Sequence, residues 1–331
     1  MTHAVLAIVI AVHLVLAVAL SGVPVERLVS VASLVAGTLI LFLVWYVGSV
    51  GARLAHRGSG RPLRTIGRLL ERDRNRIVQG TGLLLAIAVA LESYTSLKVQ
   101  IPEFIPFYAD PYFADLDLAL FGQDPWVLTH VIMGVEVTRW IDWFYLYPCG
   151  LVTMGMTVWA CFSTDKEFRK RSVLAFVLCW LLLGVWVAVG LSSAGPVYYE
   201  HFYGLDRFEP LVETLAPDLE AVRIQKALLL DNEGIKLGSG ISAMPSMHNA
   251  TYILLAVMVY SQHGLGWRFS TTVAFEFLVF VSSVHLGWHY AVDALLPIFL
   301  VPLVWWLAGR IVETERKQSI AMSRDPSALG A

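Results

Sequence analysis

Apolar stretches of about 20 residues recur along the whole chain, separated by polar segments of unequal length. A helical stretch of that length matches the hydrocarbon core of a bilayer. Lipid cannot pair exposed backbone groups, and the stretches do not alternate apolar with polar residues, so helices are expected rather than a barrel. The pattern predicts an all-α, polytopic membrane protein with about eight transmembrane helices. The expected spans are residues 4–21, 28–50, 78–97, 140–162, 172–191, 246–262, 269–287 and 290–312.

The polar connections divide the chain into three parts. Residues 1–77 hold two helices and a basic loop, residues 78–312 hold a six-helix membrane domain, and residues 313–331 form a tail. The first apolar stretch is interpreted as a helix rather than a signal peptide, because no Lys or Arg precedes it. The arginines of the basic loop recur every four residues from Arg64 to Arg76. They predict either a helix lying on anionic headgroups or a solvated loop.

Charge and composition refine this picture. Hydrophobic residues make up 57% of the chain and charged residues 15%, whereas soluble domains have about a quarter charged. Of the 24 Lys and Arg, 17 fall on one side of the expected helices and 7 on the other. Cytoplasmic loops retain positive charge, so the richer side, which includes both termini, is expected to be cytoplasmic. We expect a protein of the plasma membrane that binds no nucleic acid.

Two short segments place ionisable side chains at the ends of expected helices, where polar residues are costly and usually functional. They are Met244–His248 and Ser282–Asp293. By the helix count, both lie on the non-cytoplasmic side and can meet there. The three cysteines, in contrast, lie in apolar stretches without paired spacing, which indicates neither a disulfide framework nor a thiolate metal site.

The spacing within these segments suits phosphoryl transfer. His289 and Asp293 are four residues apart, so on one helix the carboxylate would hold one imidazole nitrogen and leave the other as a nucleophile. His248 follows Pro245, which suits a first helical turn, where free N–H groups form an anion site. Ser246 adds a hydroxyl donor. Two such histidines can attack phosphorus and protonate the departing oxygen.

The same residues resemble the type 2 phosphatidic acid phosphatase (PAP2) superfamily, whose later motifs read P-S-G-H and S-R-x5-H-x3-D. Pro245–His248 matches the first motif with Met247 in the glycine position, and Ser282–Asp293 matches the second with Ser283 in the arginine position. The chain looks most like the branch of inositolphosphorylceramide synthase, and more distantly like sphingomyelin synthase, over residues 80 to 310. Supporting segments are Lys98–Pro102, Pro106-Phe107, Asp110, Asp117, Gly122–Trp126 and Gly195–Tyr199.

The resemblance implies a six-helix catalytic core without metal or cofactor. His289 attacks phosphorus to give a phosphohistidine, Asp293 orients His289, and His248 protonates the departing oxygen. The family's first motif, K-x6-R-P, ends here as Gly195-Pro196, so two arginines of the usual phosphate clamp are missing. Substrate contacts are therefore expected from Ser246, Ser283, Tyr198, Lys98, Arg207 and His285, the last through hydrogen bonds to its neighbours.

The missing arginines favour a phosphodiester, which carries one negative charge, over a phosphomonoester, which carries about −1.5 to −2. We expect an enzyme that moves a phospho-headgroup, such as inositol phosphate, from a phospholipid to a lipid alcohol. If the loop bases Arg207, Arg223, Lys226 or Lys236 restore the clamp, the enzyme is instead a phosphatase acting on phosphatidic acid or polyprenyl phosphate.

Two alternatives belong to other classes. A transporter without chemistry would show broken helices or inverted repeats near mid-membrane. A zinc hydrolase could use His285, His289 and Asp293, which recur every four residues, with His248 as the fourth ligand. The chain contains no H-E-x-x-H motif to favour zinc. The sequence does not predict the oligomeric state.

Overall fold

The computed structural model describes residues 1–21, 62–230 and 239–324, together with helical residues 33, 35–40, 42–44, 46 and 48. Within these residues the chain is helical and has no strand, which confirms the all-α prediction. Nearly half of the expected second span, 28–50, lies outside the described residues, and so does Lys236.

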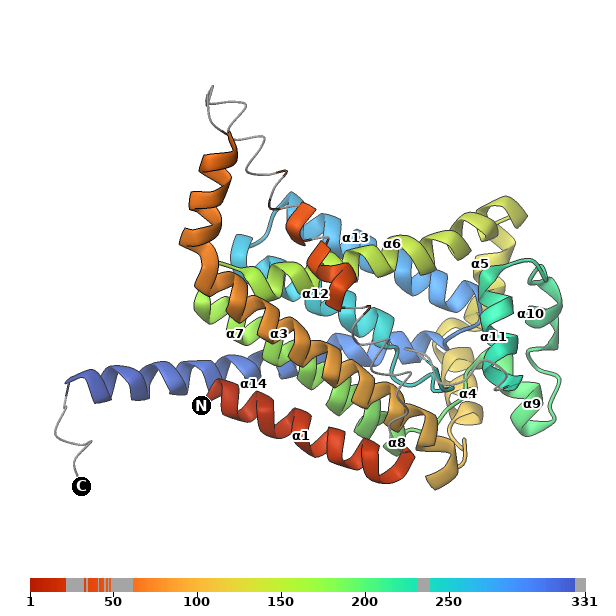
Figure 1. Cartoon of the computed structure of the whole chain (residues 1–331). Helices are drawn as coiled ribbons and strands as arrows, with labels where there is room; N and C mark the ends of the chain where they lie inside the picture. The colour runs from red at the N-terminus through yellow and green to blue at the C-terminus, as the bar shows by residue number, and fades with distance from the viewer. Residues whose placement is uncertain are drawn as a thin grey trace.

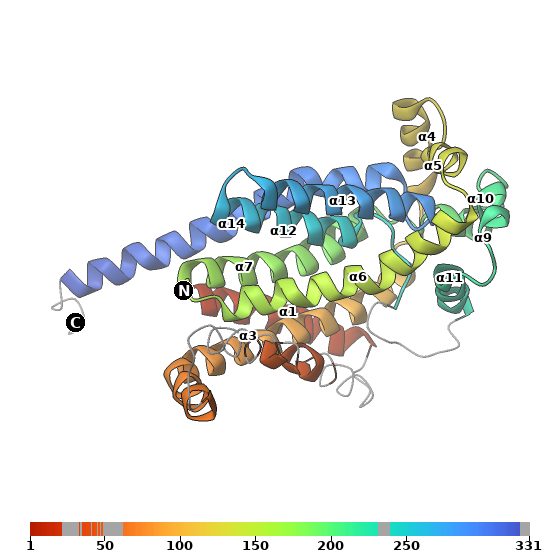
Figure 2. The ribbon, with the colours of Figure 1, turned by 90° about the horizontal axis from the view of Figure 1, so that it is seen from above.

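The long helices of the described part run side by side (Figures 1 and 2). One of them is not α-helical throughout: α7 (Lys166–Leu178) continues as a π-helix over Cys179–Val187 and then as the short α-helix α8, Ala188–Gly190. The long helices are α1 (Thr2–Ser21), α3 (Pro62–Phe104), α6 (Val135–Phe162), α7 (Lys166–Leu178), α12 (Met247–His263), α13 (Trp267–His285) and α14 (Ala291–Arg324).

Five segments of the described part are long and apolar enough to cross a membrane. Helices α12 and α13 occupy the expected spans 246–262 and 269–287 but are not among these five, and α12 has only 17 residues. The membrane character of the chain is therefore clear, whereas the count of eight spans is not established. The five segments are Thr2–Leu20, Ile66–Phe104, Val135–Phe162, Lys166–Gly190 and Ala291–Ser323.

Helix α3 is longer than the expected span 78–97 at both ends. It begins at Pro62, so the arginine-rich segment is helical rather than a loop, and it ends at Phe104. Proline suits the first turn of a helix because its missing N–H would be unpaired there anyway. The extra turns at the far end keep Lys98 inside the helix instead of in a loop.

Short helices gather at one end of the molecule, which we call the histidine end because α12 and α14 begin there and α13 ends there (Figures 1 and 2). They fill the two long connections that the sequence left without regular structure. The first residue of α1 and the last residue of α14 lie at the opposite end (Figure 1). The short helices are α4 (Asp110–Phe121), α5 (Pro125–Ile132), α9 (Tyr199–Tyr203), α10 (Glu209–Thr214) and α11 (Glu220–Leu230).

Two clusters of buried apolar side chains hold the fold together. The larger joins α1, α3, α7, α12 and α14 along their lengths. The smaller joins the short helices to α6, α13 and the start of α14, and includes the buried side chains of Tyr252 and Tyr290. The second cluster fixes the short helices over the ends of the long ones, and thereby positions the segments that carry the motifs.

Candidate active site

The first motif opens helix α12 and leaves His248 exposed. Ser246 precedes the helix, and its hydroxyl accepts hydrogen bonds from the backbone N–H (3.5 Å) and the side-chain amide (2.8 Å) of Asn249. Such a cap satisfies a donor that the start of a helix leaves unpaired. Ser246 and Asn249 are buried, whereas His248 is exposed and packs against Tyr145 with ring centroids 4.5 Å apart. His248 is therefore open to a ligand.

The second motif forms a turn followed by a helix. Helix α14 begins only after His289, whose backbone N–H donates to the carbonyl of Ser283 at 3.3 Å. Asp293 lies in the first turn of α14, and its Oδ2 accepts a hydrogen bond from the backbone N–H of Tyr290 at 2.9 Å. This bond turns the carboxylate toward the loop, so that Oδ2 lies 3.5 Å from Nδ1 of His289.

The structure thus brings His289 and Asp293 together, although not by the geometry that the sequence suggested. The four-residue spacing would place both residues on one helix face if the helix began by His289, but His289 lies in the loop and the carboxylate folds back to reach it. In the described part of the chain, Nδ1 of His289 has no hydrogen-bond partner. Catalytic hydrogen bonds often shorten only when substrate binds, so the 3.5 Å separation is compatible with a positioning carboxylate.

The two motifs are in direct contact. The backbone N–H of Ser246 donates to the carbonyl of Asp293 at 2.9 Å. A side-chain contact reinforces the junction, because the Asn249 amide also lies 3.4 Å from the hydroxyl of Ser283. The start of α12, the end of α13 and the start of α14 therefore form one buried junction, as their shared side of the membrane predicted.

Lys98 approaches this junction from a third helix, α3. Its side chain is partly exposed, and it forms no ion pair with any residue that the structure describes. Burial and, to a smaller extent, the positive charge of Lys98 lower the pKa of the His289 imidazole to about 3. The ammonium group also lies close enough to His248 to interact with it electrostatically. Lys98 is therefore a candidate for a positive charge near the two histidines.

The two positions where the superfamily pattern has arginines are closely packed. Gly195 has φ +103°, which side chains rarely adopt, and a Cβ there would lie 2.7 Å from the carbonyl oxygen of Trp288. Ser283 is fully buried, and its hydroxyl donates to the carbonyl of Phe280 at 2.8 Å. An arginine at position 195 would force the backbone next to His289 to move.

Asp110 joins the Gly195 segment to the second motif. Its carboxylate accepts hydrogen bonds from the backbone N–H groups of Ala194 (2.9 Å) and Gly195 (2.7 Å). The same carboxylate accepts from the hydroxyls of Tyr203 (2.9 Å) and Tyr290 (3.1 Å). Asp110 is fully buried, and these four donors compensate for its burial.

Asp117 holds the start of α14. Its two carboxylate oxygens accept the backbone N–H groups of Ala291 (2.7 Å) and Val292 (3.0 Å), the first two residues of the helix. Burial raises the pKa of Asp117 to about 7, although these two hydrogen bonds act in the opposite direction. Asp117 therefore caps α14 from a helix more than 170 residues earlier in the chain.

His285 is held away from the histidine pair by threonines. Its Nε2 is 2.8 Å from the hydroxyl of Thr138, and its Nδ1 is 2.9 Å from that of Thr129. Its ring stacks on His130 with centroids 3.9 Å apart. Both ring nitrogens are therefore occupied, and His285 ties α13 to α5 and α6. Among the described residues, no three His, Cys, Asp or Glu side chains are arranged to hold a metal ion.

Arg207 and Tyr198, which the sequence proposed as phosphate ligands, have other partners. Arg207 forms ion pairs with Asp115 (2.7 Å) and Asp124 (2.8 Å), and these bonds raise its pKa further above the ordinary value. The hydroxyl of Tyr198 donates to the carbonyl of Gln225 at 3.4 Å. Both side chains stabilise the short helices of the histidine end.

Sequence reasoning missed two residues of the site, Asn249 and Tyr145. Asn249 gave a signal, because it is an amide in an apolar helix directly after the motif histidine. Tyr145 gave none, since it is one of several aromatic residues in an apolar stretch. Its contact with His248 depends on how α6 packs against α12, which the sequence pattern does not specify.

Comparison with known proteins agrees with this geometry. The sequence matches the PAP2 superfamily over residues 112–307, which includes His248, His289 and Asp293 and most of the long helices. No curated protein and no solved structure matches the chain. The family match covers more than half of the chain, and we conclude that this helical membrane protein belongs to the PAP2 superfamily, whose members generally act as phosphatases or phosphotransferases on lipid phosphates.

Proposed function

We propose that the chain is a membrane phosphotransferase that moves a phospho-headgroup from a phospholipid to a lipid alcohol through a phosphohistidine. Its catalytic domain is residues 78–312, and the enzyme spans the plasma membrane about eight times. The histidine end faces the non-cytoplasmic side and both termini are cytoplasmic. The distribution of Lys and Arg supports this orientation, with 17 of 24 on one side.

The observation that carries the proposal is the contact between the two motif segments: the backbone N–H of Ser246, next to His248 in the first motif, donates to the carbonyl of Asp293, whose Oδ2 lies 3.5 Å from Nδ1 of His289. In the proposed reaction, Nε2 of His289 forms a bond to phosphorus while the bond from phosphorus to the diacylglycerol oxygen breaks. His248 gives that oxygen its proton. The acceptor hydroxyl then gives its proton to His248, its oxygen bonds to phosphorus, and the N–P bond breaks.

Asp293 would stabilise the charge that His289 acquires during this cycle. Once His289 bonds to phosphorus through Nε2, its ring needs a proton on Nδ1, and Oδ2 of Asp293 lies 3.5 Å from that atom. A carboxylate there fixes the tautomer and the ring orientation. This division of roles gives each of the three motif side chains a separate task without a metal ion.

Lys98 supports a diester rather than a monoester substrate. It contributes one positive charge, which matches the single negative charge of a phosphodiester such as phosphatidylinositol. Of the four loop bases that could have restored a larger clamp, the two arginines are paired with carboxylates, Arg207 with Asp115 and Asp124 and Arg223 with Glu220. Lys226 forms no ion pair with any residue that the structure describes, and Lys236 lies outside the described residues.

The alternative within the superfamily is a lipid phosphate phosphatase, in which water takes the place of the lipid alcohol. Kinetics with two donor lipids separate the two functions. We expect kcat/KM for phosphatidylinositol, measured with a ceramide or diacylglycerol acceptor, to exceed that for phosphatidic acid. A preference for phosphatidic acid of tenfold or more, equivalent to about 1.4 kcal/mol in transition-state binding, would contradict the diester proposal.

A transporter is the alternative from another class. The ionisable residues of the site lie at helix ends rather than in broken helices at mid-membrane, which favours an enzyme. Turnover by purified protein in detergent, with no membrane separating two compartments, would exclude transport as the only function.

A further inference from the structure

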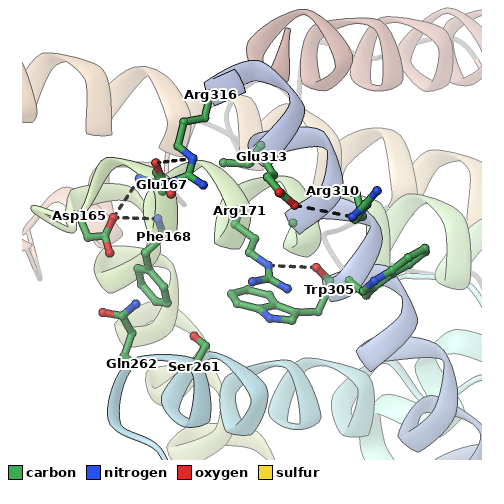
Figure 3. A pocket seen from close by; sticks show the side chains of 13 residues that line it. Asp165, Glu167, Phe168, Arg171, Ser261, Gln262, Trp305, Arg310, Glu313 and Arg316 are labelled. Carbon is green, nitrogen blue, oxygen red and sulfur yellow. Dashed lines mark hydrogen bonds and ion pairs between the residues drawn. The ribbon is translucent and has the colours of Figure 1, made fainter. Parts of the chain in front are cut away.

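A cavity of about 430 Å³ lies at the end of the molecule opposite the histidines, between α7, α12 and α14 (Figure 3). Arg310 in its wall follows the start of α14 by 19 residues, about 28 Å along a helix. The hydrocarbon core of a bilayer is about 30 Å thick. The cavity is therefore at the depth of the lipid headgroups in the leaflet remote from His289.

The acidic side chains of this cavity already have partners. Glu167 pairs with Arg316 at 3.7 Å and Glu313 with Arg310 at 3.8 Å, as Figure 3 shows. The carboxylate of Asp165 accepts backbone N–H groups of the first turn of α7. These contacts balance the negative charges of the three acidic side chains.

Arg171 differs from the other cations of the cavity because it forms no ion pair with any residue that the structure describes. Its Nε donates to the carbonyl of Trp305 at 3.1 Å, and its Cζ lies 4.2 Å from the centre of the indole ring (Figure 3). Gly309 leaves room for it, since a Cβ there would lie 2.7 Å from the guanidinium carbon. The guanidinium is therefore held in place while its terminal nitrogens remain free to bind an anion.

We propose that this cavity binds the phosphate of an anionic phospholipid from the leaflet remote from the active site, with Arg171 as the main ligand. A planar guanidinium binds phosphate oxygens through two parallel hydrogen bonds. Trp306 is 55% exposed beside the cavity, and Leu303 and Leu307 are 50% and 40% exposed on the same helix. An indole ring at headgroup depth with leucines nearby suits a lipid whose chains lie along α14.

Lipid titration by native mass spectrometry tests the proposal on the full-length protein in detergent. We expect wild type to bind phosphatidylglycerol at least fivefold more tightly than phosphatidylcholine, and Arg171→Gln to lose this preference. Arg268→Gln is the matched control, because it removes an exposed arginine from the same end but outside the cavity, and it should bind as wild type does. Equal binding of the two lipids by wild type, or unchanged binding by Arg171→Gln, would overturn the proposal.

A second variant keeps the test decisive if Arg171→Gln does not fold. Gly309→Ala retains every charge but displaces the guanidinium, so it should weaken phosphatidylglycerol binding by at least threefold without affecting phosphatidylcholine. Unchanged phosphatidylglycerol binding by this variant would contradict the role of Arg171. Inorganic phosphate provides the last comparison: if millimolar phosphate displaces the lipid, the cavity is a site for soluble anions and the lipid proposal is wrong.

Discussion

Individual residues explain why the site lacks the two arginines of the superfamily pattern. Gly195 is required by a backbone conformation and by the close approach of Trp288, and Ser283 is enclosed between α12 and α13. In the proposed mechanism the cation comes instead from Lys98, on a helix that ends before the family match begins. The exchange moves the positive charge from the motif segments to α3.

The low pKa of His289 makes a prediction about pH. A nucleophilic imidazole must be unprotonated, and burial together with Lys98 lowers the pKa of His289 to about 3. The nucleophile is therefore fully unprotonated well above this pKa and becomes protonated only as the pH falls through it. We expect kcat/KM, which reports the free enzyme, to show no acid limb near pH 6.5, the ordinary pKa of histidine.

Removal of the lysine charge should shift that profile in a known direction. Lys98→Gln removes one of the causes that lower the pKa of His289. The acid limb of the kcat/KM profile should therefore move to higher pH in this variant. Lys98→Arg keeps the charge and is the matched control. An acid limb that stays in the same place in Lys98→Gln would show that Lys98 does not act on His289.

At the scale of secondary-structure elements, buried aspartates determine where the catalytic loop sits. Asp117 on α4 accepts the first two N–H groups of α14, and Asp142 on α6 accepts the N–H groups of Glu220 and Ala221 at the start of α11. Only the first of these caps lies next to His289. The two aspartates thus cap helices in the same way, one next to His289 and the other away from it.

Asparagine substitutions at Asp117 and Asp142 separate an effect on catalysis from a general effect on stability. An Asn side chain has one acceptor oxygen, so each variant loses one of two helix-capping hydrogen bonds. We expect Asp117→Asn to lower kcat at least tenfold with little change in KM, because the start of α14 shifts relative to His289. Asp142→Asn should remain within twofold of wild type in kcat. Equal losses in the two variants would indicate a general effect on stability instead.

These elements also show how far the sequence could predict the structure. The apolar pattern predicted the long helices of the described part, although α3 and α14 extend well beyond their expected spans and the short helices of the histidine end were not predicted. The motif spacing predicted that Asp293 approaches His289, and the two side chains lie 3.5 Å apart. The expected span 290–312 already began after His289, but the pattern did not predict the turn that brings the Asp293 carboxylate back to His289, because that turn depends on the hydrogen bonds of Ser283 and Tyr290.

Other features could not be predicted from the sequence for a different reason. The role of Asp117 depends on contact between residues more than 170 positions apart, which no local pattern encodes. For the same reason His285 resembled a substrate or metal ligand by its spacing, whereas the structure occupies its nitrogens with Thr129 and Thr138 from distant helices.

The whole molecule has two chemically different ends. The histidine end carries the motifs and the short helices. The opposite end carries the first residues of α1, the last turns of α14 and the Arg171 cavity (Figures 1 and 3). If the molecule spans the bilayer, the two ends must be in different aqueous compartments. The orientation inferred from Lys and Arg then assigns the histidine end to the non-cytoplasmic side.

Cysteine labelling of intact cells measures this orientation. Glu213 and Thr164 are both exposed, the first on α10 at the histidine end and the second in the turn between α6 and α7. The three native cysteines are buried and should contribute little background. A membrane-impermeant maleimide should label Glu213→Cys in intact cells and Thr164→Cys only after permeabilisation. The reverse result would invert the orientation, and labelling of both from outside would contradict the spanning arrangement.

The central claim, transfer through a phosphohistidine, is tested most directly by trapping the intermediate. Purified enzyme is mixed with phosphatidylinositol in the absence of an acceptor, quenched in base and analysed by mass spectrometry of its peptides. Our account predicts inositol phosphate on His289, labile in acid, and no adduct in His289→Asn, whereas His285→Asn should still form it. An adduct on a different residue, or undiminished adduct in His289→Asn, would contradict the account.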